Sequence, residues 1–137
     1  MKTRTLGLDV GSKRIGVALE DELGITAQPL TVLDVDRDDA VGMIGDLCKK
    51  HRVGTVVVGL PLSMSGQDRG SSARRARALG EKLEQSLEIE VVFWDERFTT
   101  VQAEKLLKSA NVKRENRKAV IDKMAAALIL QGYLDAR

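Results

Sequence analysis

Residues 3–19, TRTLGLDVGSKRIGVAL, determine the first element of the fold. Apolar or small residues alternate with others along residues 3–9 and again along residues 14–19, as they do in strands that present one face to a core. Gly11 and its neighbours, between the two segments, are typical of a turn. The sequence therefore predicts an antiparallel β-hairpin that carries Asp9 at the end of its first strand.

The rest of the chain alternates between strand and helix patterns. We expect further strands at residues 30–33, 55–58 and 90–94, helices at residues 40–51, 71–86, from Thr99 onward and at 118–134, and a polar linker over residues 111–116. Five strands interleaved with helices predict an α/β fold with one mixed five-stranded sheet flanked by helices. With 137 residues, the chain is expected to form a single domain over residues 1–137.

The residue composition excludes several kinds of catalytic site. Cys48 is the only cysteine and His51 the only histidine, so a disulfide framework, a Cys/His zinc site and a histidine-assisted nucleophile all lack necessary parts. Cys48 falls on the apolar face of the helix expected at residues 40–51 and is interpreted as a core residue. We find no signal peptide and no membrane span, and the cysteine usage indicates a cytoplasmic protein.

The formal net charge is only +2, but the basic residues gather in two stretches. One contains Arg69, Arg74, Arg75 and Arg77, and the other contains Lys105, Lys108, Lys113, Arg114, Arg117 and Lys118. Each stretch is either a solvated helix face, as most charge runs are, or a surface that contacts the phosphates of nucleic acid. The charge pattern alone leaves both interpretations open.

Asp9 is the first candidate for a functional carboxylate. It shares a strand face with Gly7. In the expected hairpin Gly16 and Ala18 lie on the same face, so no large side chain stands beside Asp9. A ligand would therefore have room to approach the carboxylate. The alternative is a turn-forming aspartate that precedes Gly11.

Two further acidic positions lie in the second half of the chain. Asp95 and Glu96 end a predicted strand, where ligands gather in parallel sheets, and they point to opposite faces, so only one of them can join a given cluster. Asp122 lies in the last helix beside small residues. The alternative for Asp95 and Glu96 is that both are solvated, with Arg97 as an ion-pair partner. The alternative for Asp122 is a solvated helix acid paired with a lysine.

Carboxylates from three separate elements have one strong shared use, which is to hold Mg²⁺ or Mn²⁺. Such ions can activate a water molecule and stabilise the leaving oxygen of a phosphodiester, and they need no histidine or cysteine. We therefore expect a metal site formed by Asp9, Asp122 and either Asp95 or Glu96. Side-chain physics alone does not choose between the last two.

Four motifs follow one another across essentially the whole chain. They are LGLDVGSKRIGVA at residues 6–18, VGLPL at 58–62, DERFTT at 95–100 and DKMAA at 122–126. Together they resemble the YqgF family, also called RuvX, of pre-16S rRNA nucleases related to Holliday junction resolvases. Several motifs at the proper spacing are more specific than any one of them.

The resemblance implies a ribonuclease H-like fold and an acidic active site that uses magnesium or manganese. Carried over by position, it implies catalytic roles for Asp9, Asp122 and Glu96, with Glu96 favoured over its neighbour Asp95. Its implied role is to process the 5′ end of precursor 16S rRNA. Related folds also act on branched DNA, so a four-way junction stays open as the substrate.

Contacts with phosphates are expected from basic residues in several parts of the chain: Lys13, Arg14, Arg74, Arg75 and Arg97. Two other protein classes stay open. One is an RNA-binding assembly factor without catalytic activity, and the other is an ATP-binding module of the actin and sugar-kinase type, which normally needs two such domains. The sequence does not decide between a monomer and a homodimer.

Overall fold

The computed structural model describes residues 2–62, 70–97, 109, 111 and 113–137, apart from the side chains of residues 114–123. The helix expected from Thr99 and most of the loop after the fourth strand lie outside these residues. The described elements are β1 (Arg4–Val10), β2 (Arg14–Glu20), β3 (Ala27–Asp34), α1 (Ala40–His51), β4 (Val53–Leu60), α2 (Gly70–Ser86), β5 (Glu90–Asp95) and α4 (Arg114–Ala136).

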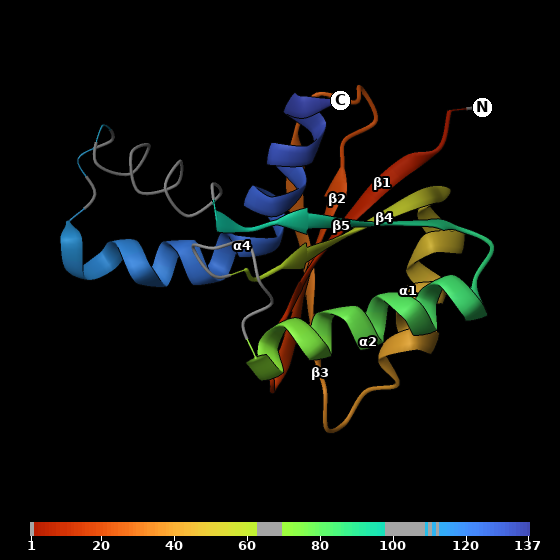
Figure 1. Ribbon diagram of the computed structural model, residues 1–137. Helices are drawn as coiled ribbons and strands as arrows, with labels where there is room; N and C mark the ends of the chain where they lie inside the picture. The colour runs from red at the N-terminus through yellow and green to blue at the C-terminus, as the bar shows by residue number, and fades with distance from the viewer. Residues whose placement is uncertain (1, 63–69, 98–108, 110, 112) are drawn as a thin grey trace.

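The five strands form one mixed sheet in the order β3-β2-β1-β4-β5 (Figure 1). β2 is antiparallel to both β1 and β3, whereas β1, β4 and β5 run parallel to one another. The predicted hairpin and the predicted mixed five-stranded sheet are confirmed. Because the parallel strands share a direction, the ends of β1, β4 and β5 that carry Asp9, Gly59 and Asp95 lie at the same end of the sheet.

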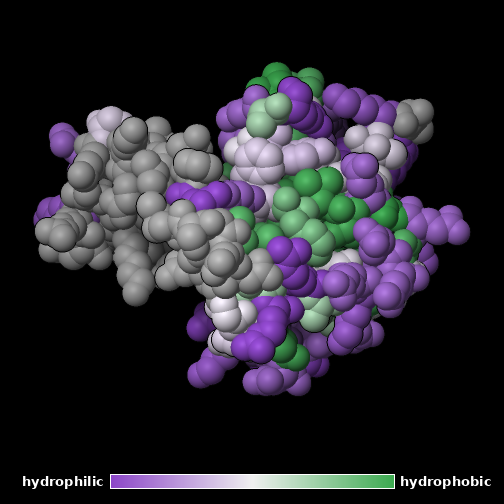
Figure 2. Space-filling view, viewed as in Figure 1, coloured by the Kyte–Doolittle hydropathy of each residue, from purple (hydrophilic) through white to green (hydrophobic). Residues whose placement is uncertain are grey.

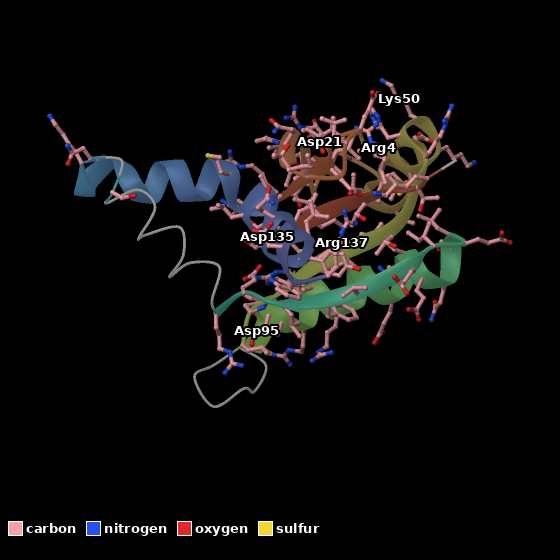
Figure 3. All side chains as sticks on the ribbon, turned by 90° about the horizontal axis from the view of Figure 1, so that it is seen from above. Arg4, Asp21, Lys50, Asp95, Asp135 and Arg137 are labelled. Carbon is pink, nitrogen blue, oxygen red and sulfur yellow. The ribbon has the colours of Figure 1, made fainter. Side chains whose placement is uncertain are left out.

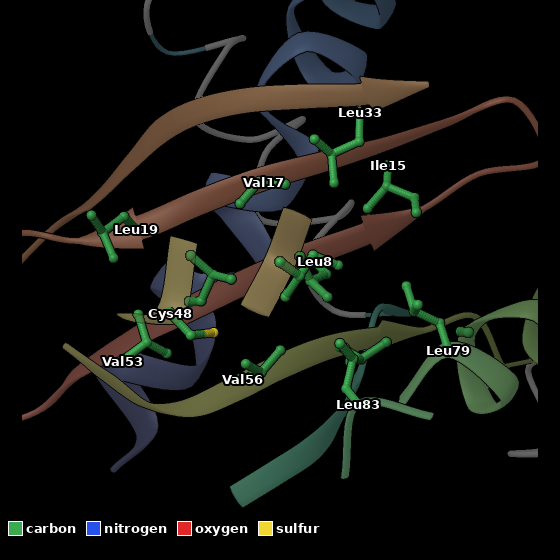
Figure 4. Close-up of a cluster of buried hydrophobic side chains, with 14 of the residues drawn as sticks. Leu8, Ile15, Val17, Leu19, Leu33, Cys48, Val53, Val56, Leu79 and Leu83 are labelled. Carbon is green, nitrogen blue, oxygen red and sulfur yellow. The ribbon is translucent and has the colours of Figure 1, made fainter. Parts of the chain in front are cut away.

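Helices cover both faces of the sheet. α1 and α2 pack on one face, where Leu8, Val56, Ile44 and Leu83 belong to one buried cluster (Figure 4). α4 packs on the other face through a second cluster: Ala18, Val57, Ala126, Ala127, Ile129, Leu130 and Leu134. Adjacent residues of a strand point to opposite faces, so a residue's position in its strand determines which helix layer it meets.

α1 matches its predicted bounds, and Asp39 caps it by accepting a hydrogen bond from the Gly42 amide at 3.2 Å. Cys48 lies on the buried side of this helix and is 6% exposed. Burial raises the pKa of the Cys48 thiol to about 11, because the thiolate would lose its hydration. The interpretation of Cys48 as a core residue is confirmed.

The Cys48 thiol is expected to be inert in the native protein. Since the thiolate is the reactive form, Ellman's reagent at about pH 8 should label almost none of the protein until urea unfolds it. Complete labelling of the native protein within minutes would contradict this burial.

β3 is longer than the four residues predicted, because Pro29 does not interrupt it. Pro29 pairs with Ala18, within a strand at the edge of the sheet. An edge strand has hydrogen-bonding partners on one side only, so it accommodates a residue without an amide hydrogen. The strand register also shifts beside this pair, between Val17 and Ala18.

α4 also differs from its prediction at both ends. It begins at Arg114, within the segment predicted to be a polar linker, and it continues past Gly132 to Ala136. Arginine, glutamate and lysine are good helix formers, so the polar composition of the segment did not indicate a loop. Gly132 lies against the Trp94 ring, where an added Cβ would be 3.1 Å from the indole nitrogen. Its role is close packing and not helix termination.

Gly7 allows α4 to approach the sheet. A Cβ added to Gly7 would lie 2.7 Å from Leu130 Cβ and 3.1 Å from the Ala126 carbonyl oxygen. Gly7→Ala is therefore expected to lower the free energy of unfolding by about 1–3 kcal/mol, as overpacking does. Urea denaturation would measure it. The control is Gly16→Ala, where the nearest atoms would be 3.5 and 3.8 Å away, so its stability should stay close to that of the unaltered protein.

Figure 2 shows one face of the molecule, on which hydrophobic residues gather along the edge strand β5 and hydrophilic residues lie over α2. None of the helices in the described part of the chain is both long enough and apolar enough to span a membrane.

Candidate active site

Asp9 lies near the end of β1, the central strand of the sheet, opposite Gly16 of β2. A Cβ on Gly16 would be 3.8 Å from Asp9 Cβ and 3.5 Å from Ala126 Cβ of α4. The Asp9 side chain is therefore on the α4 face, as Gly7 is. The prediction that no large side chain of β2 stands beside Asp9 is confirmed, because its neighbour in β2 is Gly16 and the nearby α4 residue is the small Ala126.

Glu96 reaches the same face from the end of β5. In β5, Val92 and Trp94 pack in the α4 cluster, so the even-numbered positions face α4. The Glu96 carboxylate lies over Gly59 of β4, where an added Cβ would collide with Glu96 Oε1 and lie 2.5 Å from Ile129 Cδ1. The Glu96 amide donates a hydrogen bond to the Leu60 carbonyl oxygen at 3.2 Å, which anchors the backbone beside β4.

Gly59 is a neighbour of both carboxylates. The parallel register pairs Leu8 of β1 with Val58 of β4, so the next residues along these strands, Asp9 and Gly59, are neighbours. Adjacent strands are about 4.8 Å apart. Asp9 and Glu96 thus come from distant parts of the sequence to adjacent places on one face, at the carboxyl ends of parallel strands.

Asp95 occupies the opposite face and is bound to Arg97. The Arg97 guanidinium donates to both carboxylate oxygens of Asp95, with Nε at 3.0 Å from Oδ1 and 2.8 Å from Oδ2 and Nη2 at 2.5 Å from Oδ2. This hydrogen bonding, chiefly from the Arg97 side chain, holds the pKa of Asp95 below its ordinary value. The strand alternation thus separates the two acids that side-chain physics alone did not rank, and it puts Glu96, the acid that the resemblance favours, on the face of Asp9.

Asp122 lies in α4, one helical turn before Ala126, and its side chain is outside the described part of the structure. Among the described side chains, no group of three aspartate, glutamate, histidine or cysteine residues is arranged to hold a metal ion. The described part of the site therefore consists of the carboxylates of Asp9 and Glu96.

The basic candidates are distributed over both faces of the sheet. Lys13 and Arg14 are exposed at the hairpin beside Asp9, and Arg14 lines the same groove as Asp9. Arg74 is exposed and Arg75 half-buried on α2, which covers the opposite face. The Arg75 Nη2 lies 3.4 Å from the Ser72 hydroxyl, and its buried Nε has no partner among the described atoms.

The other end of the sheet holds a separate group of charges, with Arg4 and Lys50 far from Asp95 (Figure 3). His51 belongs to this end and lines a hollow together with Arg4 and Lys50. Partial burial, with help from the charges of Arg4 and Lys50, lowers the pKa of His51. The only histidine therefore lies at the opposite end of the sheet from Asp95 and Glu96.

Gly59 is the site residue that sequence reasoning missed. The sequence places it in the VGLPL motif after a buried strand and assigns it no role at the site, whereas in the structure it leaves the space that the Glu96 carboxylate occupies. Its place at the carboxyl end of a parallel strand was the available signal. Its relation to Glu96 depends on the pairing of β4 with β5.

The family model described as "RuvX: Holliday junction resolvase" matches residues 3–136. The chain belongs to the RuvX family. A protein of Bacillus cytotoxicus is 46% identical over 139 residues, which covers 98% of this chain and 99% of the relative. Another, of Halalkalibacterium halodurans, is 50% identical over 135 residues and 96% of each chain. Both relatives bear the name "Putative pre-16S rRNA nuclease". The predicted membership is confirmed.

Solved structures show the fold of this RuvX-family chain. RuvC of Thermus thermophilus, in complex with a Holliday junction substrate, superimposes with a TM-score of 0.57 at 17% identity, over 99% of this chain and 96% of RuvC. The fowlpox virus Holliday junction resolvase gives a TM-score of 0.52 at 7% identity, over 98% and 99% of the two chains. The predicted ribonuclease H-like fold is confirmed.

Proposed function

We propose that this chain is a divalent-metal-dependent nuclease that hydrolyses phosphodiester bonds in structured nucleic acid, with Asp9, Glu96 and Asp122 as its catalytic acids. The observation that carries the proposal is the Glu96 carboxylate over Gly59, one strand away from Asp9. Membership in a family whose members are named as nucleases and resolvases supports the same chemistry.

The donor set suits a hard divalent cation. Asp9 and Glu96 offer only carboxylate oxygens, and the sole thiol and sole imidazole are in the core and at the other end of the sheet. Magnesium and manganese prefer such oxygen ligands. Gly59, by lacking a side chain, keeps the space that the Glu96 carboxylate needs. When bound, Mg²⁺ or Mn²⁺ supplies an activated water and stabilises the leaving oxygen.

Asp9, Glu96 and Asp122 are the residues that would hold the cation. The place of Asp122 in α4 supports its inclusion, because it precedes Ala126 by one turn and residues one turn apart lie on the same face of a helix. Ala126 lies beside the Asp9 face, since a Cβ added to Gly16 would be 3.5 Å from Ala126 Cβ. We assign Asp95 no ligand role, because its oxygens bind Arg97 on the other face.

The chain positions its carboxylates before the substrate arrives. Asp9 belongs to a central strand that is paired on both sides, so its backbone is rigid. In hydrolysis, a water oxygen bonds to phosphorus, the bond from phosphorus to the leaving oxygen breaks, and a proton passes from the water to the leaving group. Arg14, exposed in the groove of Asp9, would neutralise a phosphate oxygen of the strand.

Other basic residues are proposed as weaker contacts. Lys13 would meet a phosphate beside Arg14, and Arg97 would do so from the Asp95 side. Arg74 and Arg75 lie on the helix layer away from Asp9, so they can contact only nucleic acid that passes around the end of the sheet. These contacts would weaken with rising salt, as backbone neutralisation does.

The substrate that we favour is the 5′ end of precursor 16S rRNA, since the curated relatives that cover nearly the whole chain are named for it. A branched DNA is the second candidate, favoured by the family description and by the name of the RuvC complex. We further propose that residues 1–137 act as one domain in the cytoplasm, as a monomer or a homodimer.

A side-by-side cleavage assay tests the function. Purified protein would be incubated with precursor 16S RNA and with a synthetic four-way DNA junction, each with MgCl₂, MnCl₂ or EDTA. We expect metal-dependent cleavage of the RNA and its loss in EDTA. Cleavage of the junction alone would favour the second candidate. Tight RNA binding without cleavage in any metal would identify an assembly factor and contradict the nuclease proposal.

A further inference from the structure

A groove of about 610 Å³ begins at Asp9 and crosses the faces of β2 and β3 beside α4. Its lining includes Arg14, Pro29, Val32 and Ala127. This volume is within the range of about 300–1,000 Å³ that is usual for sites of small ligands. The mechanism proposed above uses only the end of the groove at Asp9, which leaves the part over β3 unexplained.

The strand register explains why the groove is open. Asp9 pairs with Gly16, and Gly16 pairs with Val32, so these residues form one row across β1, β2 and β3. Residues opposite one another in antiparallel strands present their side chains on the same face. Because Gly16 has no side chain, a gap separates the Asp9 carboxylate from the Val32 side chain. Ala126 and Ala127 bound this gap on the α4 side with small side chains.

The two ends of the groove differ in chemistry. Arg14, an exposed residue two positions before Gly16 in β2, lines the groove together with Asp9. At the β3 end, Val32 is 59% exposed and Pro29 is also exposed, so an apolar surface faces solvent there. A ligand that matches this arrangement has an anionic group at one end and a flat apolar face at the other. A nucleotide has both features.

We infer that the groove holds one unpaired nucleotide of the strand being cut, with its base against Pro29 and Val32 and its phosphate beside Arg14. A base within a duplex is stacked on both faces, so it can pack against these side chains only where it is unstacked. The chain would therefore cut a strand in which this nucleotide is unpaired, as in a single-stranded tail, a loop or the branch point of a junction. This inference rests on the proposed nuclease function.

Nucleotide titrations of the full chain test the groove without any cleavage step. The probes are 5′-AMP, adenosine and ribose 5-phosphate, each added with MgCl₂ while backbone amide shifts are followed by NMR. We expect AMP to shift the amides of Gly16, Val32 and Ala126. Ribose 5-phosphate, which lacks the base, should bind about tenfold more weakly. Arg14→Gln should weaken AMP but leave adenosine unchanged.

A matched pair of variants isolates the apolar wall. Val32→Ser should weaken AMP binding about fourfold, the effect of losing roughly one methylene of apolar contact. Ile25→Ser is the control, because Ile25 is 62% exposed but lies before β3 and outside the groove. Thermal melting of both variants checks that each remains folded.

Three results would overturn the inference: equal binding of AMP and ribose 5-phosphate, amide shifts confined to another part of the chain, or equal effects of the two serine variants. A cleavage assay separates this outcome from the nuclease proposal. If Asp9→Asn abolishes cleavage while AMP does not shift the amides of the groove residues, the nuclease proposal stands and the groove inference fails. If AMP binds as expected but Asp9→Asn cleaves normally, the proposed catalytic role fails instead.

Discussion

Asp9→Asn is expected to reduce metal-dependent cleavage by at least about a thousandfold and to leave the fold intact. A bound divalent ion supplies several kcal/mol of transition-state stabilisation, and about 1.4 kcal/mol corresponds to a factor of ten in rate. The amide has nearly the shape of the carboxylate but lacks its charge, so it would hold the cation poorly. Single-turnover cleavage of the preferred substrate, with enzyme in excess, measures the loss.

The control for Asp9→Asn is Asp21→Asn, at the other end of the sheet. Asp21 accepts hydrogen bonds from the Ile25 and Thr26 amides in the loop between β2 and β3, so its loss affects that turn. We expect it to retain the full cleavage rate. Circular dichroism and urea denaturation of both variants would test whether unfolding causes any loss. Cleavage by Asp9→Asn at the unaltered rate would remove Asp9 from the mechanism.

Glu96→Gln is expected to lower the cleavage rate by about a hundredfold or more, whereas Asp95→Asn should change it by less than about threefold. The two acids are adjacent in the sequence, but Glu96 lies over Gly59 next to Asp9 and Asp95 binds Arg97 on the opposite face. The Asp95→Asn change removes a partly exposed ion pair, which contributes at most about 1 kcal/mol to stability.

The pair of variants is informative because each replaces an acid by its amide and the two positions are adjacent in the sequence. Rates would be measured over a range of Mg²⁺ concentrations. If higher Mg²⁺ partly restores Glu96→Gln but has no effect on Asp95→Asn, Glu96 acts through cation binding. The reverse ranking of the two variants would place Asp95 at the metal and contradict the geometry described above.

Much of the fold could be predicted from local patterns. The hairpin of β1 and β2, the helix α1 with its Asp39 cap and the buried strand β4 all appear where alternation, capping chemistry and β-branched runs indicate them. The errors arose where composition was ambiguous. Pro29 is compatible with a strand only because β3 is at an edge, and the polar residues at the start of α4 are good helix formers although the segment was predicted to be a linker.

The sequence by itself limited the side chains available for chemistry, since it contains one histidine and one cysteine but several acids at or near predicted strand ends. It also identified the family, through motifs in a characteristic order. The resemblance favoured Glu96, but only the tertiary structure gives the geometric reason, which is that Glu96 and not Asp95 lies on the face of Asp9. That arrangement depends on the pairing of β4 with β1 and β5, which places Gly59 between Asp9 and Glu96. Such contacts join residues far apart in the chain, and no local pattern encodes their register.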